Sequence, residues 1–226
     1  MSTTSADLLS ALRERSDASV AAPIADQGGI HMPMRDLFAV AKSHRQLPLA
    51  EVGTILDHAD GIVRLSGVCV LDFKARAVDT RAQRRPFCEM YLRNHDRIDT
   101  WGMVDRAAPW VVGGSLDGHD LMVLHKLASS DRPIERRSAI TAPLYFVKYG
   151  DDAEVTRSFE IAARLAHDPE SVVHNAVGIF IKHAGRRLPE QQRTFLERHA
   201  HTMPRSGLRL AITQLDATTR QRYLNP

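Results

Sequence analysis

The chain has 226 residues, of which 43% are hydrophobic and 6% aromatic, and its formal net charge at pH 7 is +3. This length can bury a full core as one large domain or one solenoid. The abundance of Ala, Leu and Arg favours helices over a β-sandwich or barrel. No stretch is apolar over enough residues to cross a membrane, and the mixed charges of residues 1–17 argue against a signal peptide.

The excess of arginine bears on the kind of binding partner, and the two cysteines bear on the redox environment of the protein. Arg outnumbers Lys, and the excess of positive charge would suit a polyanion if it gathered on one face. Cys69 and Cys88 stand in apolar or mixed surroundings with no short paired spacing. We therefore predict reduced core thiols rather than a disulfide or a zinc site.

Apolar residues recur at helical spacing and are interrupted by short Pro, Gly or Asp turns, which predicts a chain of helices. The segment 61–75 is rich in valine, but its apolar positions keep helical steps, so we expect a buried helix there. Pro86 is expected to kink or end the helix that contains it. The predicted helices are 5–15, 34–43, 49–58, 61–75, 77–93, one beginning near 101, then 118–129, 133–149, 153–166, 169–185, 189–201 and a last pair within 206–223, with a loop at 21–33.

The lengths of these segments, roughly 11 to 17 residues, are typical of stacked helix pairs. We therefore predict an all-α fold, an α-solenoid of stacked antiparallel helix pairs. Residues 1–226 are expected to form a single domain, with residues 1–28 as a peripheral helix and loop.

A carboxylate and an indole share one helical face within residues 94–109. Asp99 or Thr100 can cap a helix start there, because each short side chain can accept from the free N–H groups of the first turn. Trp101 and Asp105 then project from the same face, one turn apart. Two interpretations remain open at this point. Asp105 is either a partly buried carboxylate held by a neighbouring arginine or a negative charge kept in a dry cleft for chemistry.

Cationic side chains recur at helix starts or on helix faces in the second half of the chain. An α-solenoid exposes one layer of helices along a concave surface, so recurrence in successive repeats would lay a basic track along it. Such a track suits a phosphate backbone. The residues concerned are Arg136 and Arg137, Lys148, Lys182, Arg186 and Arg187, and Arg205 and Arg209.

Three short motifs follow one another along the chain. Residues 101–108 spell Trp-Gly-Met-Val-Asp-Arg-Ala-Ala, residues 136–140 Arg-Arg-Ser-Ala-Ile, and residues 174–182 His-Asn-Ala-Val-Gly-Ile-Phe-Ile-Lys. In order and separation they resemble motifs of the HEAT-like-repeat DNA alkylation repair glycosylases (AlkD-like). These read Trp-Asp-x-Val-Asp-x-x-Ala, Arg-Arg-x-Ala-Ile and Lys-Ala-Ile-Gly-Trp-x-x-Arg, and the resemblance extends over residues 29–215.

The resemblance implies roles for individual residues. Asp105 corresponds to the catalytic carboxylate, and Trp101 corresponds to the side chain that lines one side of the active site. Arg137 corresponds to the arginine that binds the DNA backbone near the lesion, and Arg136 is the less favoured candidate for this role. Ile179 takes the place of a second active-site tryptophan in the wall beside the lesion. The motifs and the basic track together predict the DNA-binding residues, which are Arg137, Arg136, Lys182, Arg186, Lys148 and Arg209.

The implied activity is hydrolysis of the N-glycosidic bond of cationic N3- or N7-alkylated purines, such as 3-methyladenine and 7-methylguanine, in duplex DNA. The family works from the backbone side without a base-flipping pocket. We accordingly expect no cofactor and no metal, double-stranded DNA with alkylated bases as the partner, and a concave basic DNA-binding face. A monomer in the bacterial cytoplasm, associated with the nucleoid through DNA, is expected, without membrane attachment.

Several positions depart from the family pattern. Ile179 and Lys182 replace its Trp and Arg, Gly102 replaces the Asp after the motif Trp, and Ile134 or Glu135 replaces the aromatic residue before the arginine pair. Ile179 and Lys182 favour an alternative, a catalytically weak or inactive repeat protein that binds branched or damaged DNA, whereas the intact Asp105 beside Trp101 argues against it.

Other classes of function find less support in the sequence. His199 and His201 are two residues apart and lie on different helical faces, and no His-Glu-x-x-His occurs, so a metal hydrolase is disfavoured. No Gly-x-Ser-x-Gly marks a nucleophile. A scaffold for protein partners would need no basic face, so salt-sensitive DNA binding would separate it from both DNA-binding interpretations.

Overall fold

The computed structural model of the protein describes residues 4–19 and 30–225, and every regular element in those two segments is helical. The predicted all-α fold is confirmed, and the helices pack in pairs as in an α-solenoid. The chain divides into two compact units, Met1–Ala107 and Ala108–Pro226. Most of the loop predicted at 21–33 lies outside the described residues.

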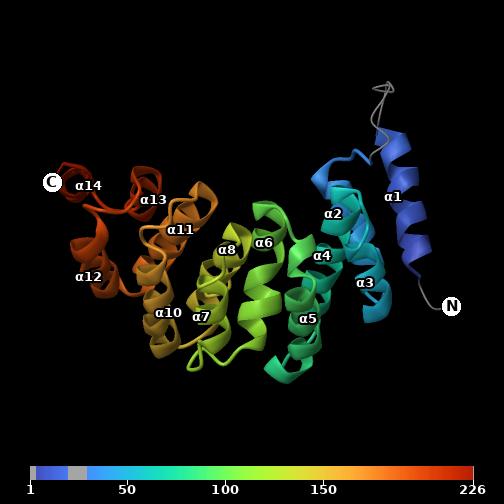
Figure 1. Ribbon diagram of the computed structural model, residues 1–226, viewed down its shortest axis with the longest axis horizontal. Helices are drawn as coiled ribbons and strands as arrows, with labels where there is room; N and C mark the ends of the chain where they lie inside the picture. The colour runs from blue at the N-terminus through green and yellow to red at the C-terminus, as the bar shows by residue number, and fades with distance from the viewer. Residues whose placement is uncertain (1–3, 20–29, 226) are drawn as a thin grey trace. The chain divides into compact units, whose positions relative to one another are not determined.

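Unit 1 is built around one central helix, α4, which packs against α2, α3, α5 and α6 (Figure 1). Every residue of α4 from Ser66 to Asp72 is buried, because this stretch is enclosed on all sides by neighbouring helices. Both predicted core thiols, Cys69 and Cys88, are buried, and neither is in a disulfide. The elements are α1 (Ser5–Ser19), α2 (Met34–Ser43), α3 (Leu49–Leu56), α4 (Gly61–Arg76), α5 (Arg81–Arg93), the 3-10 turn η1 (His95–Arg97) and α6 (Trp101–Ala107).

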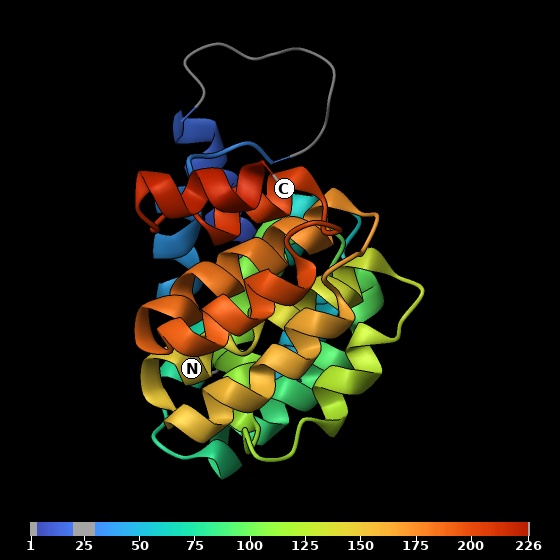
Figure 2. The same cartoon turned by 90° about the vertical axis from the view of Figure 1, so that its left-hand side faces the viewer.

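Unit 2 is built in the same way around α11, which packs against α8, α9, α10, α12 and α13. The orange helix α11 and the red helix α13 lie side by side in Figures 1 and 2. The elements are the π-helical turn η2 (Ala108–Val112), the 3-10 turn η3 (Gly113–Ser115), α7 (Met122–Ala128), α8 (Pro133–Thr141), α9 (Leu144–Tyr149), α10 (Asp152–Arg164), α11 (Ser171–Arg187), α12 (Pro189–His199), α13 (Arg205–Ala211) and α14 (Ala217–Leu224). None of the helices within 4–19 and 30–225 has the length and apolarity needed to cross a membrane.

Local chemistry explains where observed helix bounds differ from the predicted ones. Helix α5 begins at Arg81 rather than 77 because Thr80 and Gln83 form a capping box. Pro86 lies inside α5 and does not end it. The helix predicted over 133–149 is divided into α8 and α9, because Pro143 has no N–H to donate to a carbonyl of the preceding turn.

One set of contacts recurs along the chain and marks the repeat. Arg64, the fourth residue after the N-cap of α4, donates to the carbonyls of His58 and Ala59 in the turn before that helix. Its Nη2 also lies 2.5 Å from the Asp99 carboxylate, 35 residues further on.

In unit 2 the equivalent residue of α8, Arg136, donates to the carbonyls of Ser130 and Asp131 and to Asp168, 32 residues further on. His174 at the same position of α11 contacts the Asp168 carbonyl and the hydroxyl of Ser206, again 32 residues on. Each such side chain ties its own helix to the preceding turn and to the next repeat.

Candidate functional site

Helix α6 carries the predicted pair of Trp101 and Asp105. The hydroxyl of Thr100 accepts a hydrogen bond from the Met103 N–H at 3.3 Å, so Thr100 is the residue that caps the helix. Asp99, the other possible cap, instead pairs with Arg64. The α-helix gives way to the π-helical turn at Ala108, one residue before Pro109, which has no N–H for the carbonyl of Asp105.

Arg106 fixes the rotation of α6 within unit 1. Its guanidinium lies 4.6 Å from the ring centroids of both Phe38 and Phe73. Its Nη2 is 2.7 Å from a carboxylate oxygen of Asp72, which is fully buried on α4. Nε of Arg76 bonds both oxygens of the same carboxylate, at 2.9 and 2.8 Å. Burial raises the pKa of Asp72, while Arg76 and Arg106 act to lower it. Because Arg106 is anchored inward, the preceding residue is turned to a different side of the helix.

Asp105 and Trp101 are therefore presented at the surface. Trp101 is 59% exposed, and Asp105 is also exposed. Because Asp105 is exposed, the partly buried carboxylate of one sequence interpretation is not found.

Asp105 occupies a position that recurs in unit 2. It is the fifth residue after the cap of α6, Thr100, as Arg137 is the fifth after the N-cap of α8 and Arg209 the fifth after that of α13. The carboxylate and two of the predicted DNA-binding arginines are thus equivalent residues of different repeats. Their burial differs, because Asp105 and Arg209 are exposed whereas Arg137 is buried.

The two arginines of the second motif differ in their surroundings. Arg136 is engaged by Asp168 at 2.6 and 3.1 Å, and this bonding raises its pKa. The contacts of Arg136 are those of a residue that joins repeats. Arg137 is 5% exposed, and its Nη1 donates to the Val172 carbonyl at the start of α11. DNA binding by these two residues remains a prediction.

The other predicted DNA-binding residues lie closer to the surface of unit 2. Lys148 on α9, Arg186 on α11 and Arg209 on α13 are exposed, and Lys182 and Ile179 on α11 are half-buried. Lys148 and Arg186 line the same pocket, so the fold brings these two cations together. Arg186 also bonds the side-chain oxygen of Gln214.

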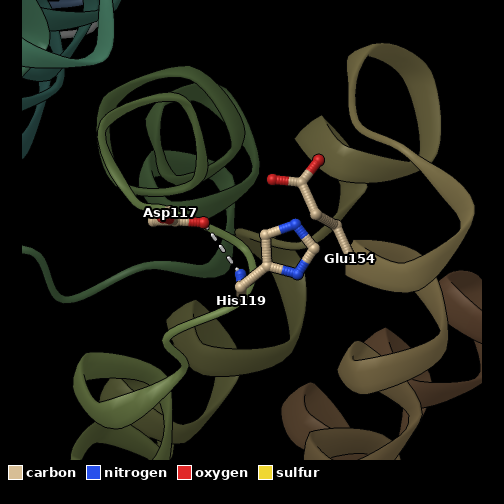
Figure 3. A group of neighbouring side chains, drawn as sticks. All are labelled: Asp117, His119 and Glu154. Atoms are coloured by element: carbon tan, nitrogen blue, oxygen red, sulfur yellow. Dashed lines mark hydrogen bonds between the residues drawn. The ribbon is translucent and has the colours of Figure 1, made fainter.

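Asp117, His119 and Glu154 form a cluster that the sequence did not single out (Figure 3). One possible ligand atom of each lies within 4.8 Å of the others. The oxygens of Glu154, however, already accept from the N–H groups of Gly118 at 3.2 Å and Asp151 at 2.9 Å. The second of these bonds closes the capping box of α10. These bonds account for the burial of Glu154 through its role in fixing the helix start.

Sequence reasoning missed the anchor formed by Asp72 and Arg106. A signal was present, since Asp72 is an isolated acid in an apolar helix and has an arginine four residues later. Its second partner, Arg106, and the two phenylalanine rings come from other helices, which only the packed unit brings together.

Comparison with known proteins bears on the role of this arrangement. A search of curated proteins gives no match. The family model described as "DNA alkylation repair enzyme" matches residues 28–215, which is most of the chain and includes every predicted site residue. The chain thus belongs to the DNA alkylation repair enzyme family, whose substrate is DNA.

Proposed function

We propose that the protein is a DNA glycosylase that releases cationic N3- or N7-alkylated purines, such as 3-methyladenine and 7-methylguanine, from duplex DNA. The observation that carries the proposal is the placement of Asp105 and Trp101 one turn apart on the exposed side of α6. The anchor of Arg106 on Asp72 holds that helix in a fixed rotation. An exposed carboxylate on a rigidly held helix can contact the backbone of a DNA duplex. A duplex could not enter an enclosed pocket.

A single carboxylate suffices for this reaction because the leaving group needs no acid. The bond between C1′ and the base nitrogen breaks, and the electron pair leaves with the base and cancels its positive charge. Asp105 stabilises the oxocarbenium-like sugar and orients the water that adds to C1′, accepting the proton that this water loses. The indole face of Trp101 favours nearby positive charge by about 0.5–2 kcal/mol.

Cationic residues of unit 2 supply the grip on the DNA in this proposal. Lys148, Arg186 and Arg209 are exposed and can reach phosphate oxygens, Arg186 by giving up its bond to Gln214. Arg137, which is buried, is assigned the phosphate next to the lesion because of its repeat position. Binding of this kind releases counterions, so the affinity for DNA falls steeply with salt.

The test compares wild type with Asp105→Asn on a duplex that contains one 7-methylguanine, by following release of the free base. We expect the rate of release to fall by about 100-fold or more, because a preorganised charge at the reacting centre contributes factors of this size. Asp57→Asn is the matched control, since it removes an exposed carboxylate of the same unit that pairs with Arg97. This control should excise at the wild-type rate.

Unchanged release by Asp105→Asn would contradict the assigned chemistry. No release by wild type, together with salt-dependent DNA binding, would instead favour a non-catalytic protein that binds damaged DNA. The half-buried aliphatic Ile179 motivates that second candidate, because it offers no aromatic face to a cationic base.

A further inference from the structure

Three aromatic rings of unit 2 form a cluster that the proposed chemistry does not use. Trp110 of η2 lies 5.2 Å from the ring of Tyr145 and 5.0 Å from that of Tyr149, and the two tyrosines of α9 lie 5.0 Å apart between ring centroids. Tyr149 is 48% exposed, which is a large exposure for an aromatic residue. Lys148 holds its ammonium 4.9 Å from the centroid of the Tyr149 ring. The cluster therefore ends in an exposed ring with a cation over it.

Lys148 also lines a pocket of about 450 Å³ between α9 and α11. Leu144 and Val147 give it an apolar floor, and each charged or titratable residue that lines it, Lys148, His183, Arg186 and Arg187, is basic. Arg187 is paired with Asp152 at 2.7 Å. Burial, with Lys182 and Arg186 nearby, lowers the pKa of His183. The charge offered to a ligand at neutral pH thus comes mainly from Lys148 and Arg186.

We infer that this surface binds one unpaired base of a DNA strand. The base stacks on the exposed ring of Tyr149, and the adjoining phosphate lies at Lys148 and Arg186. Both features border Lys148, so a single nucleotide with its flanking phosphate can engage them together.

The chemistry of the surface favours a nucleotide over other ligands. A base offers a flat π-face and stacks on aromatic side chains whatever its identity, while its phosphate seeks cations. The apolar pocket floor suits the hydrophobic side of a deoxyribose. Within a paired duplex the base faces are already stacked, so the aromatic cluster adds affinity only where a base has left the stack.

This inference rests on the proposed function in that it presupposes DNA binding. The experiment uses the full-length protein and two oligonucleotide duplexes, one fully paired and one with a single bulged 2-aminopurine, whose fluorescence falls on stacking. The dissociation constants of both duplexes are measured for wild type, Tyr149→Ala and Tyr149→Phe. Met122→Ala truncates another exposed apolar side chain of unit 2, at 73% exposure, and serves as the matched control.

We expect wild type to quench the bulged 2-aminopurine and to bind that duplex more tightly than the paired one. Tyr149→Ala should weaken binding of the bulged duplex about tenfold, which corresponds to ~1.4 kcal/mol. Tyr149→Phe keeps the ring and should bind like wild type, as should Met122→Ala. The affinity for the paired duplex should be the same for all four proteins.

Three results would overturn the inference: no quenching, an equal loss on both duplexes, or equally tight binding of a bulge that lacks the base. Failure of the proposed function looks different. If the protein binds both duplexes but excises no 7-methylguanine, the glycosylase proposal fails while Tyr149 can still be tested. If it binds neither duplex, DNA binding itself is refuted.

Discussion

Replacing Gly178 by alanine should destabilise unit 2, because α11 and α13 touch there through their backbones. A Cβ at Gly178 would lie 2.3 Å from the carbonyl oxygen of Gly207 and 2.9 Å from Cβ of Leu210. Conversely, a Cβ at Gly207 would lie 2.5 Å from the carbonyl oxygen of His174. Backbone atoms cannot rotate away, so the two helices would have to separate by about 0.7 Å, which forfeits a quarter to a half of the dispersion energy of each affected contact.

The expected size follows from two opposing terms. Overpacking a tight interface costs about 1–3 kcal/mol, and the contact with backbone places Gly178→Ala near the upper end. Replacing a glycine in a helix interior by alanine stabilises the folded state by ~1 kcal/mol. The net loss is about 2 kcal/mol, or roughly 4–8 °C in Tm for a chain of this size. Thermal unfolding followed by circular dichroism measures it.

Gly102→Ala is the matched control, because a Cβ at Gly102 meets nothing within 4 Å. This variant should keep the wild-type Tm or raise it by about 1–4 °C, since alanine lowers the entropy of the unfolded chain. If Gly178→Ala and Gly102→Ala melted at the same temperature, the argument from backbone contact would be refuted. The same crossing positions Ile179, which follows Gly178 on α11, and Arg209 on α13. Gly178→Ala should therefore also weaken DNA binding.

Two further predictions concern ionisable groups. Burial raises the pKa of Cys69 to about 12, and Cys88 is 5% exposed. Neither thiol should react with a disulfide reagent at about pH 8 in the folded protein, and both should react in concentrated guanidinium chloride. Rapid labelling of the native protein would contradict this burial. Asp151 caps α10 by accepting from the Glu154 N–H at 2.8 Å, and this bond lowers the pKa of Asp151 from its ordinary value of 3.8. A lowered pKa in the folded state means stability that is present above pH 3.8 and lost as the pH falls through the lowered value. Asp151→Ala should therefore melt below wild type at neutral pH, and the gap should narrow in acid. A gap that did not change with pH would show that the carboxylate charge plays no part in the cap.

The helical class, most helix positions and the shared face of Trp101 and Asp105 follow from the amino-acid sequence alone. These features depend on contacts between residues three or four apart, on short capping side chains and on proline. All of these determinants are local in the amino-acid sequence. The family resemblance was likewise carried by short motifs, and the family model confirms it. The choice between Asp99 and Thr100 as the cap was left open because either side chain can accept the same N–H groups.

Tertiary structure decided which charges are available and which are occupied. Arg136 and Arg137 are adjacent residues of one motif, yet their partners differ. Arg136 bonds Asp168 and Arg137 donates to the Val172 carbonyl, and each partner lies more than thirty residues further along the chain. Asp72 and Arg106 meet across two helices, and that meeting turns Arg106 inward while Asp105 stays at the surface. The partner of a charged side chain is set by packing between distant segments. Local sequence patterns carry no information about such pairs, because many partners are compatible with the same helical periodicity.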